Sequence, residues 1–445
     1  MFKKIRSFIN DRRGNVLVTT AIAAPVMAGF AGLAVDVGHT YYSQSQLRGA
    51  VEASALAHAE NYTASEVWSI GYGQFRNHAN DIASSILISQ QNLPDNHGYV
   101  AIDSSDFERG QWDIENEVFT PFEPGLILNA VRVRGEMSAD RDNAVSTFFG
   151  RMFGYSPDLT AEVYAAAPII PTFHLLDPHA SNAYYRDASS DTDGGDIWVN
   201  SDAVDAFFSG DSTGMGSVGI YIKGGATGAL RSKVRQNMFR LPDLLVDQAE
   251  PHRPSCSHTD MEIDTPSHVV LNPGAYCGGL TITRAASVTF NPGIYNFLDG
   301  PFSVLASTSV RGSDVLLHFD GRDAALDIQN GDIDFGGRRT DEFRGFVVFS
   351  SRDSTDEIPH RITNARAQFA GVVYMPDNPL FINDSFVNGN CHTLCLVSAR
   401  LNISNSSFLN WYRNFNLQAP LSAEPRVTPA VLEPFLRPYL IFPEA

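Results

Sequence analysis

An uncharged stretch near the amino terminus constrains this chain more than any other feature of its sequence. Gly14 to Val35 comprises 22 residues and contains no Asp, Glu, Lys or Arg. As an α-helix this stretch would be roughly 33 Å long, close to the thickness of the hydrocarbon core of a bilayer. We therefore predict a transmembrane helix over residues 14–37.

The charges before this stretch predict its orientation. Residues 1–13 carry five Lys or Arg residues against Asp11, a local net charge of +4. Positive flanks stay in the cytoplasm, so we expect a cytoplasmic basic segment (1–13), a single pass through a membrane, and an exported body. A cleaved secretory signal also has a basic start, but its apolar stretch is usually shorter. A buried core helix fits poorly with five cations directly upstream.

Small residues recur on one face of the predicted membrane helix. Ala24, Ala28 and Gly32 lie four residues apart, and Asp36 continues their line to the membrane edge. Small residues let another helix approach closely, so this face is a candidate surface for packing against another helix. Such residues are common in membrane helices, and the pattern alone leaves the assignment open.

Two further units follow before residue 170. Residues 38–96 read as an amphipathic helical stalk, because Leu47, Val51, Ala55 and Ala59 form an apolar stripe at helical spacing. Residues 97–168 combine strand-like runs with Gly- and Pro-containing turns and one short apolar segment, which predicts a small α+β unit.

The largest part of the chain, residues 172–416, has the pattern of an all-β right-handed parallel β-solenoid. Short β-branched runs alternate with turn residues, and LNPGAY (271–276) recurs as FNPGIY (290–295). Periods near 20 residues are typical of stacked coils, whereas a β-sandwich would show clearer hairpin signals. We expect the solenoid turns to contain several Asn residues, namely 383, 388, 390, 402 and 405. Residues 417–445 form a Pro-rich carboxy-terminal tail.

Residues 12–59 resemble the amino-terminal region of TadG-like proteins of the Tad/Flp pilus assembly system. The matching elements are Arg12-Arg13-Gly14-Asn15, Pro25, the Gly32–Asp36 exit and the Leu47–Ala57 helix. Further segments look like later parts of the family: GQWDIENEVFTP (110–121), NAVRV (129–133), FFGRMFG (148–154), HLLDP (174–178), WVNS (198–201), LNPGAYCGGLTI (271–282) and FNPGIY (290–295). The resemblance implies a non-enzymatic, envelope-anchored pilus component.

The resemblance also raises the question of processing. Prepilin-type peptidases cut after a Gly that a Glu follows five residues later. Gly14 and Asn15 offer such a position, but Thr19 stands where the Glu belongs. Gly14 is a possible processing site that departs from the family pattern.

Four cysteines follow in the exported part of the chain: Cys256, Cys277, Cys391 and Cys395. An oxidising compartment favours two disulfides, and proximity in sequence favours Cys256–Cys277 and Cys391–Cys395 among three possible pairings. Zinc binding at residues 391–395 is the alternative, but no second pair of ligands accompanies it.

Charge and motif content limit the functions open to the body. The net charge of −18 becomes −22 without residues 1–13, which disfavours nucleic-acid binding. We expect no catalytic residues, no metal site and no cofactor. The expected partners are pilin-like or Tad assembly proteins and the lipid bilayer. One alternative is an adhesin whose solenoid binds a surface or a glycan. A carbohydrate-active enzyme, a further alternative, would use carboxylate pairs such as Asp320/Asp323, Asp332/Asp334 and Asp353/Asp356.

Overall fold

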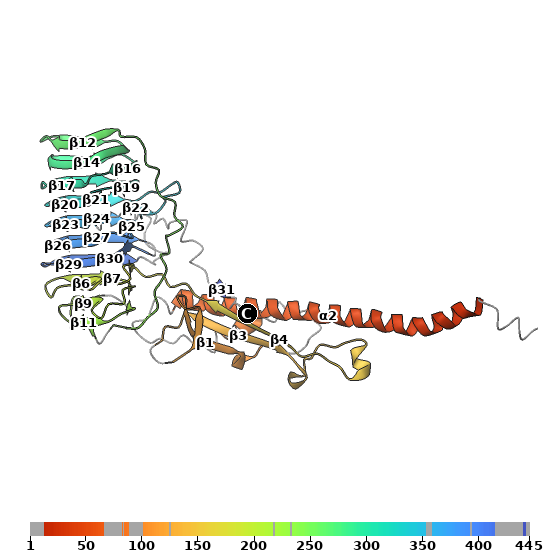
Figure 1. Ribbon diagram of the computed structural model, residues 1–445. Coiled ribbons are helices and arrows are strands. Elements are labelled where there is room, and N and C mark those ends of the chain that lie inside the picture. The colour runs from red at the N-terminus through yellow and green to blue at the C-terminus, as the bar shows by residue number, and fades with distance from the viewer. Residues whose placement is uncertain are drawn as a thin grey trace, which may run out of the picture.

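The computed structural model consists of a long helix, a small antiparallel sheet beside it and a stacked parallel β-solenoid (Figure 1). It describes residues 13–65, 82, 84–88, 101–123, 126–216, 219–231, 234–352, 358–391, 394–413 and 439–441. The basic segment 1–12, most of the stalk beyond residue 65 and most of the tail 417–445 lie outside the described residues. The three predicted kinds of structure are all present.

Helix α2 (Arg13–Ser65) continues without interruption from the predicted membrane segment into the stalk. It is long and apolar enough to cross a membrane. Between residues 19 and 35 nearly all its side chains are exposed. The predicted stripe of Leu47, Val51, Ala55 and Ala59 is fully buried, which confirms that this half is amphipathic. The amino-terminal half of α2 is therefore exposed, whereas one face of its carboxy-terminal half is buried.

The small unit is a five-stranded antiparallel sheet against the buried half of α2. Its order is β2-β1-β3-β4-β31, with bounds β1 Phe107–Asp113, β2 Val118–Pro121, β3 Ala130–Met137, β4 Leu159–Ala166 and β31 Tyr439–Ile441. The helical stripe packs on the inward residues of β3 and β4, including Val131, Val133 and Val163. Strand β31 brings three residues of the predicted tail back to this sheet, a pairing that the sequence pattern did not indicate.

The solenoid contains about 10 coils, and all its strand pairings are parallel. This excludes the sandwich alternative for the described strands. The strands of the coils that come first in the chain are β5 Phe173–Leu175, β6 Tyr184–Arg186, β7 Asp191–Gly194, β8 Ile197–Val199, β9 Phe207–Ser209, β10 Ile220–Ile222, β11 Ala226–Gly228, β12 His258–Asp264, β13 His268–Leu271, β14 Gly274–Arg284 and β15 Ser287–Phe290. The remaining strands are β16 Gly293–Leu298, β17 Phe302–Val304, β18 Ser309–Gly312, β19 Val315–Asp320, β20 Leu326–Gln329, β21 Asp332–Gly336, β22 Phe346–Ser350, β23 His360–Thr363, β24 Arg366–Ala370, β25 Val372–Met375, β26 Leu380–Asn383, β27 Phe386–Cys391, β28 Leu396–Ser398, β29 Leu401–Ser404 and β30 Phe408–Arg413.

The sequence repeat corresponds to one coil of the stack. Leu271 of β13 lies opposite Phe290 of β15, and the Asn291 amide donates to Asn272 Oδ1 over 2.8 Å. Inside the stack, buried aromatic rings such as Phe297 and Phe319 lie one above the other, with centroids 5.2 Å apart. The core is therefore a column of apolar side chains repeated from coil to coil.

The Asn residues expected in turns divide between turns and strands. Asn405 occupies a turn with a left-handed backbone (φ 56°), as expected. Asn388 and Asn390 lie within β27, Asn402 lies within β29, and Asn383 ends β26. Strand positions that face away from the core accept polar side chains without cost, so the Asn content did not mark the turns alone.

The coils do not follow the order of the chain. The chain enters at β5–β7 and passes through β8–β9 to β10–β11, the lower end in Figure 1. It then crosses to the opposite end at β12 and returns coil by coil to β28–β30. This last coil pairs with the first, β28 with β5, β29 with β6 and β30 with β7. The two ends of the solenoid sequence thus meet inside the stack.

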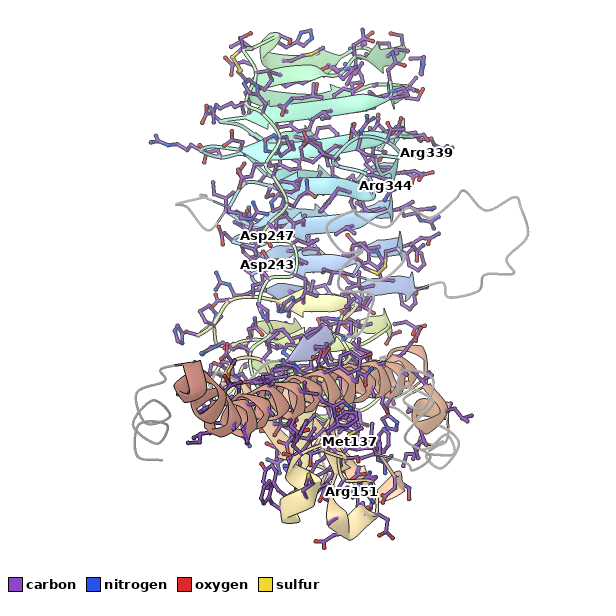
Figure 2. All side chains as sticks on the ribbon, turned by 90° about the vertical axis from the view of Figure 1, so that its right-hand side faces the viewer. Met137, Arg151, Asp243, Asp247, Arg339 and Arg344 are labelled. Atoms are coloured by element: carbon purple, nitrogen blue, oxygen red, sulfur yellow. A yellow bond between two sulfur atoms is a disulfide. The ribbon has the colours of Figure 1, made fainter. Side chains whose placement is uncertain are left out.

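Residues 238–257, here called the strap, make this crossing along the outside of the coils (Figure 2). The strap is attached at successive levels. Asn200, after β8, exchanges hydrogen bonds with Leu241, and Tyr374 of β25 donates to Asp243. Arg352, after β22, donates to the carbonyl oxygens of Leu245 and Gln248 at 2.7 and 3.0 Å. The strap therefore ties together coils that are distant in sequence.

Candidate functional site

The exit of α2 from its apolar half forms a clamp around Asp36. This carboxylate is buried and accepts hydrogen bonds from the backbone N–H groups of Phe148, Phe149 and Gly150, at 2.7, 3.0 and 2.7 Å. A buried carboxylate requires such donors, and bonds to a charged acceptor are stronger than neutral ones. Asp36 thus holds the segment that begins the 3-10 helix η3 (Gly150–Phe153) against α2.

A close contact one helical turn before Asp36 completes the clamp. Gly32 is buried, and a Cβ atom at this position would lie 2.5 Å from the ring of Phe149. Only glycine allows the ring to lie this close to the helix. Residues 147–155, here called the clamp loop, and α2 from Pro25 to Tyr41 line a mainly apolar groove of about 790 Å³.

The clamp covers some of the residues predicted to form the helix-packing face and leaves the others exposed. Gly32 and Asp36 are covered by the clamp loop of the same chain, whereas Ala24 and Ala28 are exposed. The face predicted for a partner helix is therefore partly occupied within the chain. The possible processing position, Gly14 and Asn15, lies in the first turns of α2, and its side chains fall outside the described residues.

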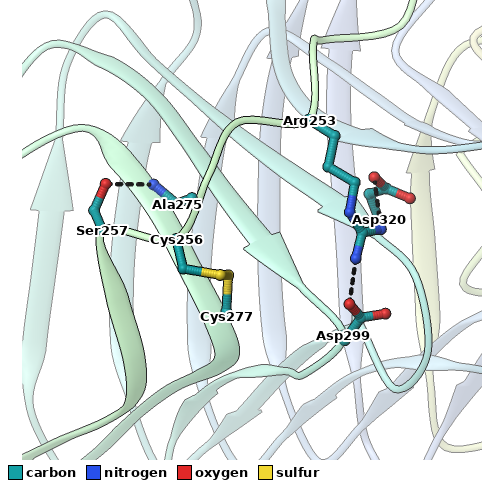
Figure 3. The surroundings of a disulfide bond; sticks show 7 residues. All are labelled: Arg253, Cys256, Ser257, Ala275, Cys277, Asp299 and Asp320. Atoms are coloured by element: carbon teal, nitrogen blue, oxygen red, sulfur yellow. Dashed lines mark hydrogen bonds and ion pairs between the residues drawn. A yellow bond between two sulfur atoms is a disulfide. The ribbon is translucent and has the colours of Figure 1, made fainter.

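The structure joins Cys256 to Cys277 and Cys391 to Cys395, the pairs that sequence proximity favours. The first disulfide links the end of the strap to β14, beside the outermost coil (Figure 3). Next to it, Arg253 of the strap forms ion pairs with Asp299 and Asp320. Terminal coils lack a neighbour on one side, so this cross-link secures the end that would otherwise separate first.

Replacing both Cys256 and Cys277 by Ser is expected to lower the free energy of unfolding by about 3 kcal/mol in the loop-entropy model, for a sequence separation of 21 residues. Hydrogen exchange should show the loss first in β12. Urea unfolding of the full chain in detergent measures the total effect, with exposed Ser255→Ala as the control. Equal stability of the double variant and the control would contradict the role assigned to this disulfide.

A second concave surface crosses six coils of the solenoid. It has a volume of about 660 Å³ and is lined by turn residues and by the first residues of successive strands. Ser309, Asp332, Arg366, Phe386 and Phe408 occupy equivalent positions along it. The Phe386 and Phe408 rings are stacked, with centroids 5.0 Å apart. A polar groove with this regular spacing suits an extended polar polymer.

Two of the three carboxylate pairs considered for catalysis lie among the described residues. Asp320 is paired with Arg253, and Asp323 stands in a turn with positive φ. Asp332 and Asp334 share the outward face of β21, opposite Arg366 and Arg311 of neighbouring coils. Opposite charges across parallel strands stabilise such a ladder. Asp353 and Asp356 lie outside the described residues. Within the part of the chain that the structure describes, no group of three His, Cys, Asp or Glu residues could hold a metal ion.

Burial shifts the pKa values of several groups in the body. Desolvation lowers the pKa of His174 and of His318 to about 4 and that of His360 to about 3. Desolvation also raises the pKa of Asp243, against the opposing effect of its hydrogen bond from Tyr374. The three histidines lie in the coils and Asp243 lies in the strap. Each of them has a structural hydrogen bond.

The sequence did not indicate that the clamp loop would lie against the helix. VSTFFGRMFG (145–154) has the length and apolar character of a short helix, and it supplies the helical part of the predicted α+β unit. In the structure only Gly150–Phe153 is helical, as a 3-10 turn, and its large side chains are exposed. The signal available in the sequence was the density of large apolar residues in FFGRMFG (148–154).

Two family models match the amino-terminal third of the chain. The Flp pilus-assembly TadE/G-like family matches residues 14–59, and the Tad-like Flp pilus-assembly family matches residues 43–165. The matched residues contain nearly all of α2, strands β1 to β4 of the small sheet except the last residue of β4, and the clamp loop. Comparison with curated proteins and with solved structures gave no match to this chain.

Proposed function

We propose that this chain, a TadG-like protein of the Tad/Flp pilus system, is a non-enzymatic envelope scaffold or minor-pilin-like subunit of pilus assembly. Helix α2 anchors it in the bacterial inner membrane, with the amino terminus in the cytoplasm and the solenoid in the periplasm or outside the cell. The basic residues before α2 support this orientation.

The observation that carries the proposal is the continuity of α2. The helix passes without a break from an exposed apolar half to a half buried under the small sheet. Because the helix is continuous, the body has a fixed position relative to the anchored half of α2. A flexible linker would leave this position variable. The solenoid, tied to the small unit by the ion pairs of Glu115 with Lys223 and Arg240, is thereby held at a defined distance from the membrane.

Contacts with assembly partners are expected on the part of the helix face that the clamp leaves open. A photo-crosslinking residue at Ala28 in cells should capture another membrane protein of the pilus system, because Ala28 is small and exposed. The matched control is Val26, which is also exposed but lies on a different side of the helix. Equal capture from both positions, or none from Ala28, would argue against a specific partner on this face.

The groove across the coils favours a second function, that of an adhesin. Its polar lining and regular spacing match an extended glycan better than a protein helix. The full chain in nanodiscs can be tested on immobilised glycans beside an Arg366→Ala variant. Saturable binding that this variant removes would support the adhesin over the scaffold, since a scaffold needs no such ligand.

A further inference from the structure

The clamp loop places large apolar side chains beside the membrane-spanning part of α2. Phe148, Met152, Phe153 and Tyr155 are exposed, and Phe153, at 88%, is the most exposed large hydrophobic residue among those that the structure describes. Figure 1 shows the loop lying along α2, on the amino-terminal side of the small sheet. In water this arrangement would leave four large apolar side chains mostly exposed, which a soluble surface normally avoids.

The depth of these side chains follows from the contacts with α2. Phe149 lies on Gly32, four residues before Asp36, and the groove between loop and helix extends to Gly29 and Pro25. At 1.5 Å per residue, Gly32 and Gly29 lie about 6 and 10 Å from Asp36 toward the membrane centre. If the hydrocarbon core ends near Val35, the loop lies at the depth reached by interfacial membrane elements, about 5–10 Å.

Aromatic and charged residues lie near the same depth, at the proposed boundary between lipid and water. Tyr41, Tyr42 and Tyr155 are exposed near the exit of the helix, as expected of residues at the boundary between lipid and water. Arg151 is exposed within the loop, and a long cationic side chain can reach lipid phosphates from this depth. Figure 2 shows Arg151 on the far side of the small unit from the solenoid.

We propose that the clamp loop inserts into the outer leaflet of the membrane, so that Met152 and Phe153 contact lipid and Asp36 holds the loop in place. The occupant of this apolar surface is the bilayer, because the surface is continuous with the exposed membrane-spanning half of α2. The protein then has two points of contact with the lipid. Two contacts restrict rotation of the body about the helix axis, which a single helix does not. The inference rests on the anchoring of α2 in the proposed function.

The test uses the full chain in nanodiscs, with one introduced cysteine carrying a nitroxide label. No free cysteine is present among the described residues, so a label can be directed to Phe153→Cys. Collisions with oxygen report lipid, and collisions with a water-soluble nickel complex report water. Leu33→Cys, exposed on α2, is the reference for lipid, and Val204→Cys, exposed on the solenoid, is the reference for water.

The label at Phe153→Cys is expected to match that at Leu33→Cys, with nickel collisions several-fold fewer than at Val204→Cys. Adding Asp36→Ala should release the loop and raise nickel collisions at position 153 while Leu33→Cys stays in lipid. Three results would overturn the inference. A Phe153→Cys label as wet as that at Val204→Cys places the loop in water. Protection from both reagents indicates a second copy of the chain instead of lipid. A wet Leu33→Cys label contradicts the membrane anchor itself.

Discussion

Acidification from pH 7 to pH 5 is expected to lower the free energy of unfolding of the solenoid by about 6 kcal/mol, about 2 kcal/mol for each of three buried histidines. His174, His318 and His360 have pKa values of about 4, 4 and 3, below their ordinary value of 6.5. Between these values only the unfolded chain binds the proton. The stability is therefore complete above pH 6.5 and is lost as the pH falls toward 4.

The hydrogen bonds of His360 give the geometric reason. Its Nδ1 accepts the N–H of Leu326 at 3.0 Å, so this nitrogen cannot carry a proton without losing the bond. Its Nε2 lies 3.0 Å from Ser350 Oγ, and the side chain is fully buried. His318 lies between Asn296 Oδ1 and Ser351 Oγ. Protonation of His360 would turn a new N–H toward the N–H of Leu326, and in all three rings it would place a charge away from water.

Urea unfolding of the full chain in detergent at pH 7, 6 and 5 measures the effect. His360→Gln, whose side-chain amide retains a donor and an acceptor, should remove about a third of the pH dependence. Exposed His252→Gln is the matched control and should leave the dependence unchanged. Unfolding curves that coincide at pH 7 and pH 5 would show that the buried rings are not kept neutral by the fold.

Replacing Arg186 by Met is expected to destabilise the solenoid by about 3–5 kcal/mol, because several buried acceptors lose their donor at a cost of about 1–3 kcal/mol each. The Arg186 side chain is fully buried, and its Nη2 donates to Ser209 Oγ, Asp211 Oδ1 and the Thr213 carbonyl at 2.7, 2.5 and 2.8 Å. Its Nη1 donates to the Ser190 carbonyl. Met fills a similar volume but leaves these acceptors without their donor.

Arg284→Met is the matched control, because Arg284 also forms an ion pair in the solenoid, with Asp264, but both side chains are more than half exposed. Exposed pairs contribute about 0–1 kcal/mol. Thermal and urea unfolding of the two variants in the same detergent compare the effects. A loss for Arg186→Met as small as that for Arg284→Met would mean that its acceptors find water instead.

The sequence predicted the parts of this fold that depend on local pattern. The membrane segment follows from an uncharged stretch, the stripe from Leu47 to Ala59 follows from helical spacing, and the coil follows from the repeat at Leu271 and Phe290. The buried Arg186 was not indicated, because an Arg followed by polar residues has the pattern of an exposed turn. Its burial depends on acceptors from a neighbouring coil.

The features that the sequence did not predict depend on tertiary arrangement. Gly32 and Asp36 share a helix face with Ala24 and Ala28, and spacing alone could not show that a segment more than 100 residues later covers two of the four. The same limit applies to the strap and to the pairing of β30 with β7, since parallel coils carry similar patterns at every level. A stack assembled out of chain order looks the same in sequence as one assembled in order.

The pairing of the first coil with the last restricts when the solenoid can finish folding. In a polypeptide synthesised from its amino terminus, β5–β7 emerge more than 200 residues before the strands that pair with them. Until residues 396–413 have been synthesised, that sheet edge has unpaired N–H and C=O groups, which attract other edges. Synthesis must therefore finish before the solenoid can close, and a prematurely terminated polypeptide would retain an open sheet edge for chaperones or proteases to recognise.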